Sequence, residues 1–201
     1  AEKVGRDNVL FHNHLADSKL LYKYPLIQYK TIGRKPAIQC IDFAVDEIHK
    51  FFNKSDWSLK ISDRWLDMKI HRLDLNQFTM QVWDKTFTYE IRNWIALNQE
   101  NFKKYQLIEN LSDKIIFLEK ILIGNILSFA KGIEWNIEKP VILKIRELRD
   151  PRPVKHKSQT VMGFNLNFST NVFLPSFLGL GKGVSLGFGV VHRHDFEKDQ
   201  S

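Results

Sequence analysis

The spacing of apolar residues predicts an α+β protein in which several short strands surround one long helix. Three observations lead to this prediction. Apolar and polar residues alternate in several separate runs, residues 111–131 repeat their apolar residues at helical spacing, and a glycine-rich stretch interrupts the last strands. The chain has 201 residues, of which 43% are hydrophobic and 12% aromatic. This composition is sufficient for a packed core.

The first half of the chain is expected to consist mainly of strands joined by turns. In chain order we expect a strand at 20–32 interrupted at Pro25, a turn at Gly33 and Arg34, a returning strand at 36–43, a short helix at 46–53, and short strands and hairpins at 57–90. Proline donates no backbone hydrogen bond, so Pro25 marks an edge or a bulge.

The second half is expected to contain the long helix and the remaining strands. In chain order we expect a strand within 86–95, a helical or irregular stretch at 91–105, the helix at 111–131, strands at 139–148 and 160–168 flanking a basic loop at 149–159, and a final strand at 187–192. Asn110 or Ser112 can cap the helix, and Gly132 suits its end.

This order of elements fits a β-α-β-β-α-β, or ferredoxin-like, module in the C-terminal half. Two such modules in tandem are therefore predicted, with residues 1–90 forming the first and residues 91–201 the second. The first module is expected to be incomplete at its start, because its initial strand and helix have no counterpart in the sequence.

The charge balance favours a polyanionic partner. Thirty Lys and Arg against 23 Asp and Glu give a net charge of +7. Such an excess is typical of proteins that bind nucleic acid or an acidic membrane surface, although an ordinary basic protein would also show it. The single cysteine, Cys40, excludes an internal disulfide and a thiolate zinc site. With no apolar run of membrane-spanning length and no signal peptide, we expect no membrane association and a cytoplasmic location.

A glycine-rich segment, residues 179–189, carries the strongest functional signal. Its sequence is Gly-Leu-Gly-Lys-Gly-Val-Ser-Leu-Gly-Phe-Gly. Closely spaced glycines let backbone N–H groups approach an anion, and Lys182 adds a positive charge. The segment lacks the Gly-Lys-Ser/Thr order of a nucleotide-binding P-loop, and no acidic residue or βαβ unit follows it. A plain hairpin turn remains the alternative.

The arrangement Gly-hydrophobic-Gly, five residues including a lysine, then Gly-hydrophobic-Gly resembles the hallmark of the CRISPR-associated Cas-six endoribonucleases. Residues 10–14, Leu-Phe-His-Asn-His, and residues 19–26 are similar to the catalytic histidine region of the b-type branch of that family. The resemblance implies two tandem ferredoxin-like modules of the RNA-recognition-motif kind. It also implies an endoribonuclease that processes CRISPR repeat transcripts.

The catalytic candidates are His14, His12, Lys19 and Tyr22. On a strand, two histidines two residues apart lie on one face, about 7 Å from each other. One would remove the proton from a ribose 2′-hydroxyl and the other would protonate the leaving 5′-oxygen, giving a 2′,3′-cyclic phosphate and a 5′-hydroxyl. Lys19 would stabilise charge on the phosphate and Tyr22 would orient the reacting groups.

No metal site and no cofactor are expected. The contiguous letters His-Asn-His do not match the spacing of a ββα-metal nuclease, and no carboxylate completes a site with His192 and His194. The histidine at position 156, between two lysines, is equally consistent with phosphate contact and with solvent exposure.

Residues of the glycine-rich segment and of the basic loop are the expected RNA contacts. They are Gly179, Gly181, Lys182, Gly183, Gly187, Gly189, Arg149, Arg152, Lys155 and Lys157. A solvated loop is the alternative for the last four. The expected partner is CRISPR repeat RNA, possible further partners being effector-complex subunits, a fused domain or a second copy. The alternative functions are an RNA-binding module that does not cut and an RNA-binding subunit of an effector complex.

Overall fold

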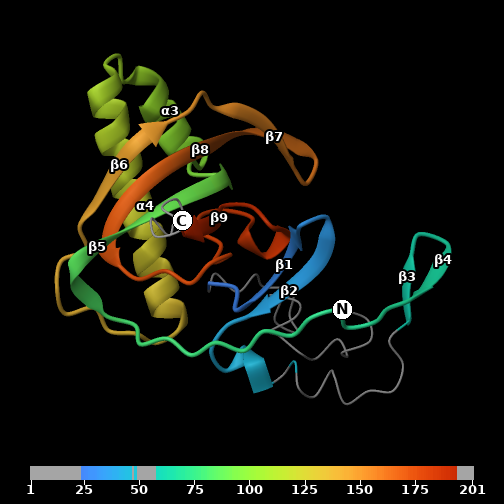
Figure 1. Ribbon diagram of the computed structural model, residues 1–201. Helices are drawn as coiled ribbons and strands as arrows, with labels where there is room; N and C mark the ends of the chain where they lie inside the picture. The colour runs from blue at the N-terminus through green and yellow to red at the C-terminus, as the bar shows by residue number, and fades with distance from the viewer. Residues whose placement is uncertain (1–23, 47, 49–57, 194–201) are drawn as a thin grey trace, which may run out of the picture.

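The computed structural model describes residues 24–46, 48 and 58–193, and these form an α+β structure (Figure 1). The predicted fold class is confirmed. The elements are β1 (Ile27–Ile32), β2 (Lys35–Cys40), β3 (Ser58–Ile61), β4 (Arg64–Asp67), β5 (Val82–Trp94), α3 (Gln99–Leu107), α4 (Leu111–Gly132), β6 (Leu143–Leu148), β7 (Arg152–His156), β8 (Gln159–Val172), the 3₁₀ helix η2 (Val184–Leu186) and β9 (Val190–Arg193). The short helix predicted at 46–53 lies mostly outside the described residues. Within the described residues, no helix is long and apolar enough to span a membrane.

The main sheet has the strand order β6-β8-β5-β9, and all neighbouring strands are antiparallel. Along the chain these strands come in the order β5, helices, β6, β8, glycine-rich segment, β9. This is the predicted β-α-β-β-α-β order, except that the glycine-rich segment with η2 stands where the second helix would be. The strand predicted within 86–95 is β5. The predicted division of the chain between residues 90 and 91 falls within β5 and stays a prediction.

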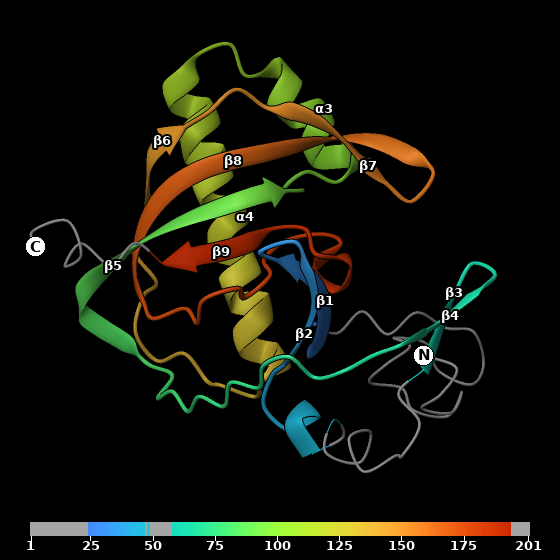
Figure 2. The same cartoon turned by 45° about the vertical axis from the view of Figure 1, so that its right-hand side comes forward.

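Helix α4 covers one face of this sheet (Figures 1 and 2). Asn110 caps it, because its side-chain oxygen accepts a hydrogen bond from the backbone N–H of Asp113 at 3.1 Å. The helix buries apolar side chains at the predicted spacing, namely Leu118, Leu122, Ile126 and Phe129. Each such side chain contributes about 1.5–3 kcal/mol on burial. Leu111, the first residue of the helix, is 63% exposed.

Two sequence expectations in this half were wrong. The expected basic loop at 149–159 contains strand β7, which pairs with β8 from Arg152 opposite Gly163 to His156 opposite Gln159. Pro153 suggested a loop, but β7 pairs only with β8 in the described structure, and an edge strand tolerates a residue without an N–H. The second error concerns residues 91–105, where β5 continues to Trp94 before α3 begins.

The N-terminal half contributes two antiparallel hairpins. In β1–β2 the turn lies at Gly33 and Arg34, as predicted, and both residues have positive φ angles, 54° and 66°. Hairpin β3–β4 projects away from the main sheet (Figures 1 and 2). Hairpin β1–β2 packs against the glycine-rich segment, through contacts between β1 and η2.

Helix α4 ends at Gly132, as expected, but Gly132 does not take the left-handed position of the helix end. Trp135 donates its backbone N–H to the carbonyl of Ala130 at 2.9 Å, and Glu134 donates to Lys131, which together form a Schellman ending. Glu134 takes the left-handed position of this motif, with φ of 56°. Gly132 is required for another reason, because a Cβ there would lie 2.6 Å from Cβ of Tyr24.

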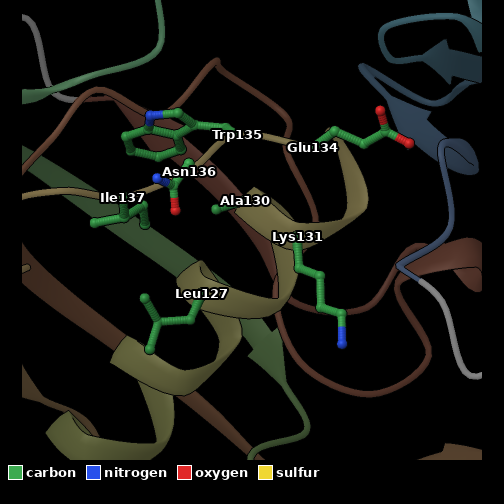
Figure 3. Close-up of a pocket in the computed structure, with 7 residues that line it drawn as sticks. All are labelled: Leu127, Ala130, Lys131, Glu134, Trp135, Asn136 and Ile137. Atoms are coloured by element: carbon green, nitrogen blue, oxygen red, sulfur yellow. The ribbon is translucent and has the colours of Figure 1, made fainter.

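A surface pocket lies beside this helix end (Figure 3). Leu127, Trp135 and Ile137 lie on one side of it, while the charged side chains of Lys131 and Glu134 point away. The pocket therefore presents mainly apolar atoms.

We predict that Glu134→Gly stabilises the protein by about 1 kcal/mol, because glycine adopts the left-handed conformation without the steric cost of a Cβ. Chemical denaturation would measure the change in the free energy of unfolding. The matched variant Gly132→Ala should destabilise the protein, since its methyl group meets Tyr24. A loss of stability in Glu134→Gly would contradict the assignment of the left-handed position to Glu134.

Candidate functional site

The glycine-rich segment folds onto its own backbone. Leu180 donates its N–H to the carbonyl of Gly189 at 2.8 Å, and Gly189 donates to Asn93 at 3.1 Å. A Cβ at Gly189 would lie only 1.9 Å from the carbonyl oxygen of Leu180, and φ at Gly189 is 63°. No residue with a side chain fits this position without moving the backbone.

Most amides of this segment are therefore committed inside the protein. Lys182 donates its N–H to Ile95, and the amides of residues 186–188 bond to carbonyls of residues 183 and 184. The expectation that glycines bring amides to an anion does not extend to these bonded amides, and for the rest of the segment it stays a prediction. At Gly179, Gly181 and Gly189 the missing side chain makes room for protein atoms, which leaves Lys182 to offer the positive charge.

Two side chains from the N-terminal half of the chain form hydrogen bonds with the backbone carbonyl and N–H of Gly179. The hydroxyl of Tyr24 donates to the carbonyl of Gly179 at 2.7 Å, and the Gly179 N–H donates to Oε1 of Gln28 at 3.0 Å. Gln28 also donates to the Tyr24 hydroxyl at 2.8 Å, which closes the network. Burial raises the pKa of Tyr24 well above its ordinary value, so the phenol stays a donor. The sequence patterns contained no signal for Gln28.

The tip of the β7–β8 hairpin lies against the same segment. A Cβ at Gly183 would meet Cδ2 of His156 at 2.9 Å and Nε2 at 3.0 Å. The imidazole packs edge-on against the ring of Phe188, with centroids 5.6 Å apart. Burial lowers the pKa of His156, and the charges of Lys157 and Lys182 lower it further. The fold thus brings the glycine-rich segment and the predicted basic segment together at His156.

The other predicted RNA-contacting residues differ in whether their charge is already paired within the protein. Arg152 and Lys155 are exposed on β7. Arg149 is paired instead, because its guanidinium bonds to Glu90 at 2.9 Å and Glu147 at 3.4 Å. Glu90 is buried and also pairs with Arg92 at 2.6 Å. Arg149 therefore belongs to a charge network on the sheet.

The catalytic candidates His12, His14, Lys19 and Tyr22 lie outside the described residues, as does His194. His192 lies on β9, where its ring packs against Phe177. Across residues 24–46, 48 and 58–193, no three His, Cys, Asp or Glu side chains gather in an arrangement that could hold a metal ion.

Both halves of the chain match family models of known proteins. Residues 1–79 match the family model of the Cas6b N-terminal domain, and residues 81–194 match that of the Cas6b C-terminal domain. The chain belongs to the Cas6b family. The resemblance to the b-type branch is thereby confirmed.

Individual relatives agree with this Cas6b assignment. A crystal structure of Cas6b is 33% identical, with a TM-score of 0.85, and the match covers 96% of this chain and 87% of that chain. A crystal structure of the CRISPR RNA processing endoribonuclease Cas6b is 30% identical, with a TM-score of 0.70 over 96% and 89%. An uncharacterised protein of Methanocaldococcus jannaschii is 40% identical over 103 residues, which are 51% of this chain and 69% of that protein.

A buried lysine, Lys30, lies where β1 packs against the glycine-rich segment of this Cas6b protein. Lys30 is only 6% exposed and donates to Oε1 of Gln39 at 2.5 Å. Its backbone lies against Gly187, where an added Cβ would come within 3.6 Å of the Lys30 Cα. Burial lowers the pKa of Lys30 from 10.5 to about 7. No sequence pattern pointed to this residue.

The low pKa of Lys30 predicts that the protein becomes more stable between pH 7 and 8.5. In this range the unfolded chain binds a proton on this lysine that the folded chain has lost, so the free energy of unfolding rises with pH. The increase should be roughly 1–2 kcal/mol, and Lys30→Met should remove it. Denaturation at a series of pH values would measure it.

Lys35→Met, a change at an exposed residue of β2, is the matched control and should keep the slope. The range stops below pH 9 because burial raises the pKa of Cys40 from 9.0 to about 11, which favours unfolding in more alkaline solution. A slope that persists in Lys30→Met would disprove this origin.

Proposed function

We propose that this Cas6b family member is an endoribonuclease that cuts CRISPR repeat RNA without a metal ion, by attack of a ribose 2′-hydroxyl. The proposal is supported by the match of both domain models in order, and by the 30% identity over 96% of the chain to a CRISPR RNA processing endoribonuclease. The observation that carries it is the complete glycine pattern, folded beside an exposed lysine in the matched C-terminal domain.

In the proposed reaction the 2′-oxygen forms a bond to the adjacent phosphorus while the bond from phosphorus to the 5′-oxygen breaks. One of His12 and His14 takes the proton of the 2′-hydroxyl, and the other gives a proton to the departing 5′-oxygen. Lys19 offsets the additional charge on the phosphate in the transition state, and Tyr22 orients the reacting groups. The products are a 2′,3′-cyclic phosphate and a 5′-hydroxyl.

The described residues offer exposed positive charge for RNA binding. Lys182 is exposed on the glycine-rich segment, and Arg152, Lys155 and Lys157 are exposed on the β7–β8 hairpin. Side chains rather than amides would make most contacts to phosphate, since most amides of the glycine-rich segment are used internally. Arg149 would contribute least of the predicted residues, because Glu90 and Glu147 already balance its charge.

The proposed metal-independent mechanism predicts that cleavage continues in excess EDTA and leaves a cyclic phosphate at the cut end. Incubation with a repeat RNA, followed by mass analysis of the product ends, would measure both. A repeat with a 2′-deoxy nucleotide at the cut site should bind and stay intact, because it lacks the nucleophile. Loss of cleavage in EDTA that magnesium restores would contradict metal independence, and binding without any cleavage would indicate a non-cutting RNA-binding protein.

A substitution near the start of the chain should impair catalysis, whereas a substitution in the glycine-rich segment should impair RNA binding. His14→Ala should reduce single-turnover cleavage by at least about 100-fold with nearly unchanged RNA affinity. Lys182→Ala should instead weaken binding several-fold and make its salt dependence shallower by about 0.7 log unit per log unit of salt, the value for one lost single-strand phosphate contact. Cleavage rates and filter binding at several salt concentrations would measure these effects. Normal cleavage by His14→Ala would disprove its catalytic assignment.

A further inference from the structure

The tip of the β7–β8 hairpin and the glycine-rich segment share one contact, at His156. The imidazole edge occupies the space that a side chain at position 183 would fill, and its ring touches Phe188. The two segments are separated by more than 20 residues of chain and strand β8. His156 is half-buried in this contact, so it is fixed in place while still reaching the surface.

Three cationic or potentially cationic groups meet at this contact. Lys157 follows His156 at the hairpin tip, and Lys182 precedes Gly183 on the glycine-rich segment. Both lysines act on the imidazole electrostatically, one from its own hairpin and one from the segment packed against it. Both charges disfavour the imidazolium in the free protein. A cluster of positive charges of this kind is suited to an anion.

The backbone at the tip is consistent with a requirement for charge. Lys157 has φ of 55°, a conformation in which glycine or asparagine is favoured. The chain thus carries a lysine at a position where a residue without a charge would be less strained.

We propose that His156, Lys157 and Lys182 form one RNA phosphate-binding site that spans the hairpin tip and the glycine-rich segment, with His156 binding as the imidazolium. This inference rests on the proposed RNA-binding function and adds a residue and a pH dependence to it. Protonated His156 donates a charge-assisted hydrogen bond to a phosphate oxygen. In the free protein the imidazole is mostly neutral at pH 7, so RNA binding takes up a proton.

The test is RNA affinity as a function of pH, measured with a repeat RNA that carries a 2′-deoxy nucleotide at the cut site. The unaltered protein should bind about five- to tenfold more tightly than His156→Gln at pH 5.5, and the two should bind almost equally at pH 8.5. His156→Phe keeps an aromatic ring against Phe188 without the charge and should behave as His156→Gln does. His71→Gln, at an exposed histidine outside the cluster, should follow the unaltered protein.

The outcomes separate a binding role from a structural one. If His156→Phe bound like the unaltered protein while His156→Gln was weaker at both pH values, the ring would only support the contact, and the inference would be overturned. Equal affinities of all variants across the pH range would overturn it as well, while leaving the endoribonuclease proposal intact. An unaltered protein that neither bound nor cut repeat RNA would overturn both.

Discussion

The closest backbone approach in the glycine-rich segment constrains the rest of the described structure. The carbonyl of Leu180 and the Cα of Gly189 are so near each other that no side chain fits between them. This contact closes the segment into a compact unit between β8 and β9, in the place of a second helix. Trp94 reinforces it, because its indole nitrogen lies 2.6 Å from where a Cβ of Gly181 would stand and donates to Asn125 of α4 at 2.9 Å. The segment is thus anchored to both the sheet and the long helix.

The same segment joins the two parts of the chain. Gly179 is bonded through its carbonyl to Tyr24 and through its N–H to Gln28, both in the N-terminal half. Leaving such a buried group without its partner costs about 1–3 kcal/mol, so the pairing specifies one relative position of β1 and the segment. Tyr24 follows the proposed catalytic residue Tyr22 by two positions. The proposed chemistry is therefore connected through a short stretch of chain to the segment proposed to bind RNA.

Charge is organised in two different ways on this protein. On the sheet, Glu90 is buried and holds Arg92 and Arg149, so the positive groups there are balanced. At the hairpin tip and the glycine-rich segment, the charges of Lys157 and Lys182 act on His156 and lower its pKa. The proposed phosphate-binding site thus lies where positive groups repel one another, although both regions are basic in the sequence.

The sequence by itself determined the family, the α+β class, helix α4 with its Asn110 cap, and the position of the glycine-rich segment, because each depends on local periodicity or on a contiguous motif. The tertiary structure decided what the residues contact. Pro153 in an edge strand and Gly132 beneath Tyr24 depend on neighbours elsewhere in the chain, and the left-handed position of Glu134 depends on how the last turn of α4 closes. The same is true of His156, Gln28 and Lys30. Their roles arise from packing between β1, the β7–β8 hairpin and the glycine-rich segment, and no local pattern records contacts over more than 20 residues.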